Sequence, residues 1–272
     1  MSITIAYTIT HTGGTFLCNL IKSNFNEKDF FWRGERFFQN RGRDKRLEDN
    51  ECSSIDTNWL QNTCFKYLDT EERNTPNILI HGHYKNKHSP LMTKLLGPSS
   101  VQLPVIISLR DPLLSLNTSL WRHYAVNNES FQDWSIEKRE SKIRDLIDRY
   151  INILYIPAER RFLFPVDIIS NKNIEDKIFI ANDLFKFCKI KMNKSALDYI
   201  YNWKPLGLTK NGTLLHTRDN GVELFNKSKK AIIENDKKEL QKIFKIEYDI
   251  LNQDKDLKNL LKSIGYSNLS WW

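Results

Sequence analysis

Apolar residues gather in short runs along the first 125 positions, and each run is followed by a turn or an apolar helix. Residues 3–9 alternate apolar and polar side chains, which predicts a buried strand. Residues 77–80 and 101–109 are further buried-strand candidates. Helical spacing of apolar residues follows the first run at 16–21 and the third run at 113–124. Strands that alternate with helices predict an α/β fold with a mainly parallel sheet.

The second half of the chain continues the pattern with longer helices. A strand is predicted over 161–169, at an edge or broken because of Pro165. Residues 204–222 lack periodicity and hold several Gly and Pro residues, which indicates a long functional loop. No repeat, low-complexity segment or linker stands out, so residues 1–272 are predicted to form a single domain. Helices are predicted over 136–155, from Asn173 to about Cys188, over 198–203, 223–251 and 254–264.

The charge balance is basic. Lys and Arg number 41 against 33 Asp and Glu, a formal net charge of +8. This balance suits an acidic ligand but is not a nucleic-acid signature, because the positive charge is spread along the chain. The dense spots, 41–46 and 227–238, are interpreted as solvated faces.

Neither a secretory signal nor a run of about 18 apolar residues occurs, so a cytoplasmic protein without a transmembrane helix is expected. The four cysteines are far apart in the sequence and form no CxxC pair. They are interpreted as reduced thiols, neither disulfides nor metal ligands: Cys18, Cys52, Cys64 and Cys188.

A turn rich in glycine and threonine joins the first predicted strand to the first predicted helix. It reads Thr10-His11-Thr12-Gly13-Gly14-Thr15. The first N–H groups of a helix lack intrahelical partners, and the helix dipole favours negative charge there. Two glycines let a phosphate approach the backbone closely. A tight turn without a ligand is the alternative, and the ATP-type pattern GxxxxGK[ST] is absent.

Two histidines end the second predicted strand, in the sequence His81-Gly82-His83. Ligands of open α/β sheets bind outside the carboxyl ends of the strands, so these imidazoles are candidates for chemistry. A metal site that also uses His88 is a weaker alternative, because no matching carboxylate or Cys set accompanies the three histidines. No metal is therefore predicted.

The third predicted strand runs directly into Arg110-Asp111-Pro112 and an apolar helix. Proline suits the first helical turn, since its missing N–H would be unpaired there. An Arg fork at a helix start can hold a phosphate bidentately. The alternative is an Arg-Asp-Pro helix cap without a ligand.

These three segments resemble the sulfotransferase family in order and spacing. The turn His11-Thr12-Gly13-Gly14-Thr15-Phe16-Leu17 is similar to the family's phosphosulfate loop, with His11 where the family has Lys. The strand ending in His83 resembles the family's strand with a catalytic His, and His81 again replaces a Lys. Arg110-Asp111-Pro112 resembles the family's strand-Arg-[Asn/Asp]-Pro element. The resemblance implies a three-layer α/β fold with a central, mainly parallel sheet and a P-loop-like (sulfotransferase) architecture.

The resemblance also implies a co-substrate, 3′-phosphoadenosine 5′-phosphosulfate (PAPS), with adenosine 3′,5′-bisphosphate as the product. Residues 12–15 and the Thr15 hydroxyl would hold the 5′-phosphosulfate, and Phe16 stands where the family stacks an aromatic on adenine. Arg110 and Thr118, with Ser119 as the neighbouring alternative, would hold the 3′-phosphate. Arg218 and Gly221 resemble the family's Arg-Lys-Gly, with one extra residue in the spacing and no Lys.

In the implied reaction His83 takes the proton of a hydroxyl or amine acceptor, since the pKa of a His lies near working pH. His11 and His81 would face the bridging oxygen, where a neutral imidazole supplies an N–H but no charge. A degenerate relative that binds the nucleotide or a sulfated ligand without turnover is therefore the second hypothesis. An ATP-dependent phosphotransferase is the third.

The acceptor is a small molecule, a carbohydrate or a lipid. The aromatic and basic stretch 29–38 either packs on the core or covers a ligand, and the loops 26–55 and 204–222 are expected to set acceptor choice. The closing Trp271-Trp272 is expected to dock on the core or to form a homodimer contact.

Overall fold

The computed structural model describes residues 2–9, 12–26, 29–34, 77–82, 103–127, 131–203, 227–232, 234–267, 269 and 271–272. The chain divides into two compact units. The first unit contains the β-sheet and the helices α1 (Gly14–Lys22), α8 (Val166–Ser170), α9 (Ile174–Phe187) and α10 (Lys194–Tyr201). The second contains α6 (Pro112–Asn127), α7 (Ile136–Ile151), a helix over 227–232, α12 (Lys237–Gln253) and α13 (Lys255–Ser263). The predicted single domain stays a prediction.

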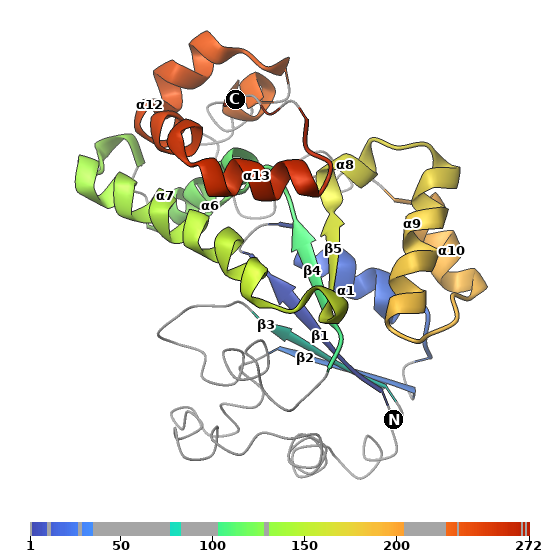
Figure 1. The fold of residues 1–272 in the computed structure, drawn as a ribbon. Coiled ribbons are helices and arrows are strands. Elements are labelled where there is room, and N and C mark those ends of the chain that lie inside the picture. Colours follow the sequence, from blue (N-terminus) through green and yellow to red (C-terminus); the bar gives the residue numbers. More distant parts are fainter. Residues whose placement is uncertain are drawn as a thin grey trace, which may run out of the picture. The chain divides into compact units, whose positions relative to one another are not determined.

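In the first unit, the described residues form a five-stranded sheet in the order β2-β3-β1-β4-β5 (Figure 1). Every neighbouring pair is parallel, which confirms the predicted sheet type. The strands are β1 (Ser2–Thr8), β2 (Phe30–Gly34), β3 (Asn77–Gly82), β4 (Val105–Leu109) and β5 (Arg161–Pro165).

The carboxyl ends of the three central strands lie side by side. Tyr7 of β1 is level with Gly82 of β3, and Thr8 is level with Ser108 of β4. The segments that leave these strands therefore start from neighbouring points at one edge of the sheet. Ligands of open α/β sheets bind outside this edge.

The core of this unit lies around β1 and β4, whose described side chains are almost completely buried. Helix α1 (Gly14–Lys22) buries one apolar stripe at helical spacing: Phe16, Leu17, Cys18, Leu20 and Ile21. Cys18 and Cys188 are free thiols. Burial raises the pKa of both, that of Cys188 to about 12, so neither thiol is a reactive nucleophile.

One sequence prediction in this unit is wrong, and one strand was not predicted. Residues 166–169, predicted as strand, belong to the short helix α8 (Val166–Ser170), and β5 ends at Pro165 on the edge of the sheet. The stretch 29–38 contains β2, a strand that the sequence analysis missed. Phe30 at its start is buried and stacks on Phe25 with 5.0 Å between ring centroids, which fits the core-packing interpretation.

The helices α9 (Ile174–Phe187) and α10 (Lys194–Tyr201) complete this unit. The predicted cap of α9 is confirmed, because Asn173 Oδ1 accepts a hydrogen bond of 2.8 Å from the N–H of Asp176. Asn193 caps α10 in the same way, through the N–H of Ala196. Short 3₁₀ turns precede β5: η4 (Asn152–Tyr155) and η5 (Ala158–Arg160).

The second unit is helical. It consists of α6 (Pro112–Asn127), the turn η3 (Phe131–Asp133), α7 (Ile136–Ile151), the 227–232 helix, α12 (Lys237–Gln253) and α13 (Lys255–Ser263). The predicted apolar face of α7 is buried: Ile143, Leu146, Ile147 and Tyr150. Leu154, predicted on the same face, lies beyond the helix end and is 47% exposed. Arg139 of α7 forms a two-armed ion pair with the buried Glu247 of α12, with its Nε 2.8 Å from Oε1.

The predicted helix 223–251 is not continuous. Asn235 has a left-handed backbone (φ 62°), and Asp236 then caps α12 by accepting from the N–H of Glu239 at 3.1 Å. The chain therefore makes two helices where periodicity predicts one.

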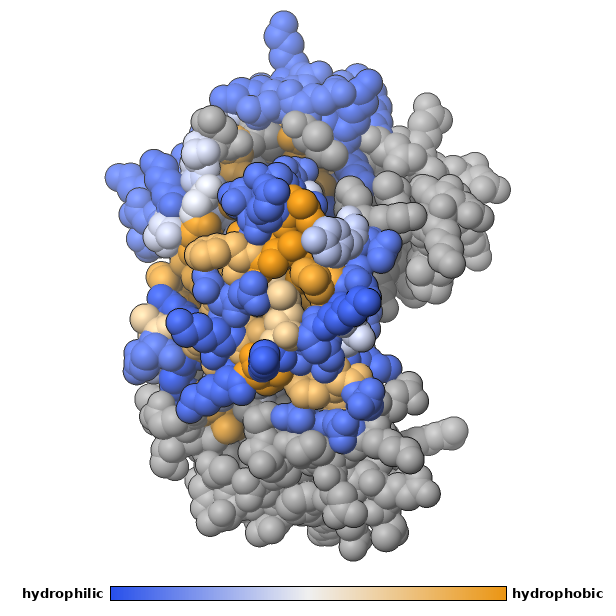
Figure 2. Space-filling view, turned by 90° about the vertical axis from the view of Figure 1, so that its right-hand side faces the viewer, coloured by the Kyte–Doolittle hydropathy of each residue, from blue (hydrophilic) through white to orange (hydrophobic). Residues whose placement is uncertain are grey.

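None of the helices in the described ranges is long and apolar enough to cross a membrane. Figure 2 shows one face, on which hydrophobic residues reach the surface between hydrophilic ones. Single exposed apolar residues are ordinary for a folded protein. Large ones in the described part are Ile136, Leu154, Tyr155, Phe179 and Tyr201.

Candidate functional site

The strand–turn–helix at the start of the chain has the geometry of an anion site. Gly13 has φ 85° and ψ 22°, a left-handed conformation that favours glycine, and it stands at the N-cap of α1. The first helical bond runs from the N–H of Leu17 to the carbonyl of Gly13 at 3.1 Å. The N–H groups of Gly14, Thr15 and Phe16 therefore point out of the helix start. Thr15 is exposed, and Thr12 is buried.

Gly14 is held against the end of β1. A Cβ at this position would lie 2.2 Å from Cγ2 and 2.8 Å from Cβ of Thr8, and 3.1 Å from Nε2 of His81. Such distances leave no room for a side chain. The close approach explains the second glycine of the turn, which the sequence analysis attributed to phosphate access alone.

His81 lies at the end of β3 and contacts this turn. Its Nε2 shares a hydrogen bond of 3.0 Å with the hydroxyl of Thr8, the last residue of β1. The imidazole is half-buried. The pairing of β3 with β1 thus brings His81, one of the two histidines that stand where the family has Lys, to the glycine turn.

Phe16 is buried in an aromatic cluster, which we define as Phe16, Phe164, Tyr199 and Trp203. Its ring stacks on Trp203 with 4.2 Å between centroids and 23° between planes. Phe164 and Tyr199 surround the pair with centroids 6.4 and 5.5 Å from Phe16. The predicted adenine-stacking residue therefore already has an aromatic partner, which the sequence analysis did not foresee.

In the second unit, Asp111 fixes the start of α6. Its Oδ1 accepts from the N–H of Leu113 at 2.8 Å and from Nε1 of Trp271 at 3.1 Å. Pro112 occupies the first helical turn, as predicted. Trp271 is completely buried, so the expected docking of the closing tryptophans on a core is confirmed for this residue.

Arg110 precedes this cap and is 8% exposed. Its backbone carbonyl accepts a hydrogen bond of 2.5 Å from the hydroxyl of Tyr150, on α7. The main chain at Arg110 is thus positioned by α7, independently of what its guanidinium binds.

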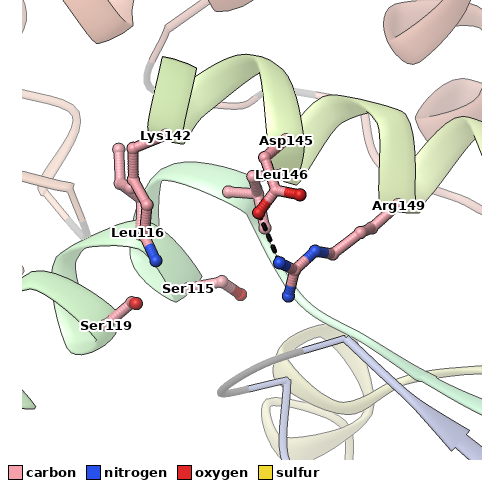
Figure 3. Close-up of a pocket in the computed structure, with 7 residues that line it drawn as sticks. All are labelled: Ser115, Leu116, Ser119, Lys142, Asp145, Leu146 and Arg149. Atoms are coloured by element: carbon pink, nitrogen blue, oxygen red, sulfur yellow. Dashed lines mark hydrogen bonds and ion pairs between the residues drawn. The ribbon is translucent and has the colours of Figure 1, made fainter. Parts of the chain in front are cut away.

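The two hydroxyl candidates on α6 differ in environment. The Thr118 hydroxyl donates to the carbonyl of Leu114 at 3.0 Å, a bond within the helix. Ser119 lines a cavity of about 10 Å³ between α6 and α7, together with Ser115, Leu116, Lys142, Asp145, Leu146 and Arg149 (Figure 3). Asp145 and Arg149 form an ion pair beside it. This space holds about one water molecule.

Four predicted site residues lie outside the described residues: His11, His83, Arg218 and Gly221. Their roles stay predictions. Of the three histidines in the metal alternative, His81 alone is described, and no group of three potential ligands occurs among the described residues.

No protein-family model and no curated protein matches the sequence. Solved structures do match. One is mouse sulfotransferase SULT7A1 complexed with PAP, with a TM-score of 0.51 and 12% identity over 97% of this chain and 89% of that chain. The chain has the sulfotransferase fold. The α/β fold class implied by the motifs is thereby confirmed.

Within the sulfotransferase fold, the residues singled out by the motifs follow β1, β3 and β4. These three strands are neighbours in the sheet. The first unit brings together Gly13, Gly14, His81 and the aromatic cluster, and the second unit carries Thr12, Arg110, Thr118 and Ser119.

Proposed function

We propose that this protein is a sulfotransferase that moves a sulfuryl group from PAPS to a hydroxyl or amine acceptor. The observation that carries the proposal is the turn after β1, with left-handed Gly13 and three outward N–H groups, in a chain with the sulfotransferase fold. A solved structure of this fold is complexed with PAP, which supports a phosphoadenosine ligand here.

The backbone at residues 12–15 and the exposed Thr15 hydroxyl hold the 5′-phosphosulfate in this proposal. No acidic residue stands in the first turn of α1 to repel it. Arg110 binds the 3′-phosphate, with Thr118 or Ser119 and the loop residues Arg218 and Gly221 as further candidates. Adenine joins the aromatic cluster at Trp203, which is less buried than Phe16.

The reaction needs a base and a stabilised leaving group. His83 takes the acceptor proton as the acceptor oxygen or nitrogen bonds to sulfur. The bond between sulfur and the bridging phosphate oxygen breaks, and adenosine 3′,5′-bisphosphate leaves with the negative charge. His11 and His81 donate hydrogen bonds to that oxygen. In this proposal the acceptor is a small molecule, a carbohydrate or a lipid. Two copies of the chain form a homodimer.

The hydrogen bond between His81 and Thr8 favours a second candidate function. One imidazole nitrogen of His81 is already engaged by the hydroxyl of Thr8. A neutral imidazole neutralises less charge on the leaving oxygen than a Lys. The alternative is a protein of this fold that binds the nucleotide or a sulfated ligand without turnover.

A thermal-shift comparison tests the nucleotide site. We expect adenosine 3′,5′-bisphosphate at about 100 times its dissociation constant to add about 2.7 kcal/mol to stability, a rise in Tm of several degrees. AMP and ATP at the same concentration are expected to give clearly smaller shifts. A larger shift with ATP would replace the proposal by an ATP-dependent phosphotransferase, and no shift with any of the three would end it.

A further inference from the structure

Five exposed lysines lie around the end of α1 and the connection between α9 and α10, all within the first unit. The buried residue Asn24, just after α1, joins these two segments (Figure 1). Its Oδ1 accepts from the N–H of Asn193 at 2.6 Å, and its Nδ2 donates to the carbonyl of residue 191 at 3.0 Å. We call the five residues the lysine patch: Lys22, Lys186, Lys189, Lys191 and Lys194.

The ammonium groups of the lysine patch lack the carboxylate partners that other lysines have. Within the described ranges, no ion pair or hydrogen bond engages the side chain of any lysine of the patch. The exposed carboxylates of the same two helices, Asp183 and Asp198, form no ion pair with them either. The patch therefore presents an excess of positive charge. Three lysines elsewhere each face a carboxylate at 2.9 to 3.9 Å: Lys172, Lys227 and Lys230.

Two lysines of the patch stand where the stability of the fold favours another residue. Lys189 has a left-handed backbone with φ 58°. Its N–H donates to the carbonyl of Lys186 at 3.0 Å, and the N–H of Ile190 donates to that of Phe185 at 2.9 Å, a Schellman turn that usually has glycine at the left-handed position. Lys194 is the first residue of α10, where the helix dipole favours an acidic side chain. Stability therefore does not explain the charge at these two positions.

We propose that the lysine patch is a docking surface for a membrane that contains anionic lipids. A Lys ammonium is a compact charge on a flexible stem, so it can follow a fluid layer of headgroups without a fixed geometry. An anionic membrane surface attracts each basic residue that comes close to it. A nucleic acid fits less well, because the patch has neither an aromatic residue on which a base could stack nor an Arg fork for a phosphate.

The lysine patch lies at the opposite end of α1 from Gly13. The helix has nine residues, and at 1.5 Å per residue it is about 13 Å long. A membrane bound at the C-terminal end of α1 therefore does not touch the N–H groups at the helix start. The inference goes beyond the proposed function and does not depend on it.

Cosedimentation with lipid vesicles tests the inference on the full chain. Wild type should bind vesicles of phosphatidylcholine with about one-third phosphatidylserine and should not bind phosphatidylcholine alone. Raising the salt from about 0.1 M to 1 M should abolish this binding, because the screening length falls from about 10 to 3 Å. The triple variant Lys189→Gln, Lys191→Gln, Lys194→Gln should bind about 100-fold more weakly, at about fivefold for each lysine.

A matched control removes the same charge from paired lysines. The variant Lys172→Gln, Lys227→Gln, Lys230→Gln should bind the anionic vesicles within about threefold of wild type. The variant with arginine at 189, 191 and 194 keeps the charge and should bind within about twofold of wild type.

Lys189→Gly separates charge from fold. It should lose about fivefold in vesicle binding, while its Tm is no lower than that of wild type, because glycine suits the left-handed backbone. A merely structural role for Lys189 would not lower vesicle binding in a protein of unchanged Tm.

Wild type that does not bind the anionic vesicles would overturn the inference, and so would equal losses in the two triple glutamine variants. A loss in the arginine variant as large as in the patch glutamine variant would also overturn it. Tighter binding of a single-stranded RNA oligonucleotide than of vesicles, lost in the patch glutamine variant, would assign the surface to nucleic acid instead. The same variant should bind adenosine 3′,5′-bisphosphate as wild type does, so each of these outcomes leaves the proposed function standing.

Discussion

Gly14→Ala is expected to abolish binding of adenosine 3′,5′-bisphosphate and to lower the free energy of unfolding by about 1–3 kcal/mol. The new Cβ would lie 2.2 Å from Cγ2 of Thr8, so the turn or the end of β1 must move. Helix propensity alone predicts the opposite sign, since Ala is about 0.8–1.0 kcal/mol better than Gly inside a helix. Urea unfolding followed by circular dichroism, with calorimetric titration of the nucleotide, measures both effects.

A double mutant identifies the cause. Thr8→Ser removes Cγ2, the closest atom, but keeps the hydroxyl that bonds His81. Adding Thr8→Ser to Gly14→Ala should restore part of the lost stability, a coupling that a double-mutant cycle isolates. Gly14→Ala protein that unfolds and binds like wild type would show that the turn is not packed as described.

Replacing both leaving-group histidines with lysine is expected to raise the rate of sulfuryl transfer about 10²-fold. Removal of one donor at a developing oxyanion costs about 10²–10³ in rate, and the substitution His11→Lys with His81→Lys adds charged donors at that position. Thr8 loses its imidazole partner at a small cost in stability. The measurement is transfer from radiolabelled PAPS to a panel of phenol, amine and sugar acceptors.

The neutral variant His81→Gln is the control, because it keeps an N–H donor without adding charge and should give no gain. If wild type and the double variant His11→Lys with His81→Lys both bind the bisphosphate but neither transfers a sulfuryl group to any acceptor, the result favours the protein that binds without turnover. A gain in His81→Gln equal to that in the lysine variant would contradict the charge argument.

Much of the fold follows from local patterns. Alternation in β1, the buried run of β4 and the apolar stripes of α1 and α7 each reveal their element, because the signal lies within the element itself. β2 was missed because Phe30-Phe31-Trp32-Arg33-Gly34 shows no alternation. This segment is a strand because it pairs with β3, where Phe30 lies beside Asn77, a residue distant in the sequence.

The candidate site likewise has features that the sequence predicts and features that it does not. The glycine turn and the strand-end His81 are visible in sequence, because turn chemistry and strand ends are local features. Contacts between distant residues are not visible, such as Trp271 on Asp111, Ser228 on Asn117 and the stack of Trp203 on Phe16. Packing decides these contacts, and no spacing rule encodes them.

The central claim is that Arg110 binds the 3′-phosphate of a phosphoadenosine nucleotide, and titration calorimetry of Arg110→Ala tests it most directly. The carbonyl of residue 110 keeps its bond to Tyr150 in this variant, so the fold is expected to survive. Wild type should bind adenosine 3′,5′-bisphosphate at least about tenfold tighter than AMP. Arg110→Ala should weaken bisphosphate binding by about 30-fold or more and leave AMP binding unchanged, while Arg144→Ala, at an exposed position of α7, matches wild type. A folded Arg110→Ala protein that still prefers the bisphosphate as wild type does would contradict the account.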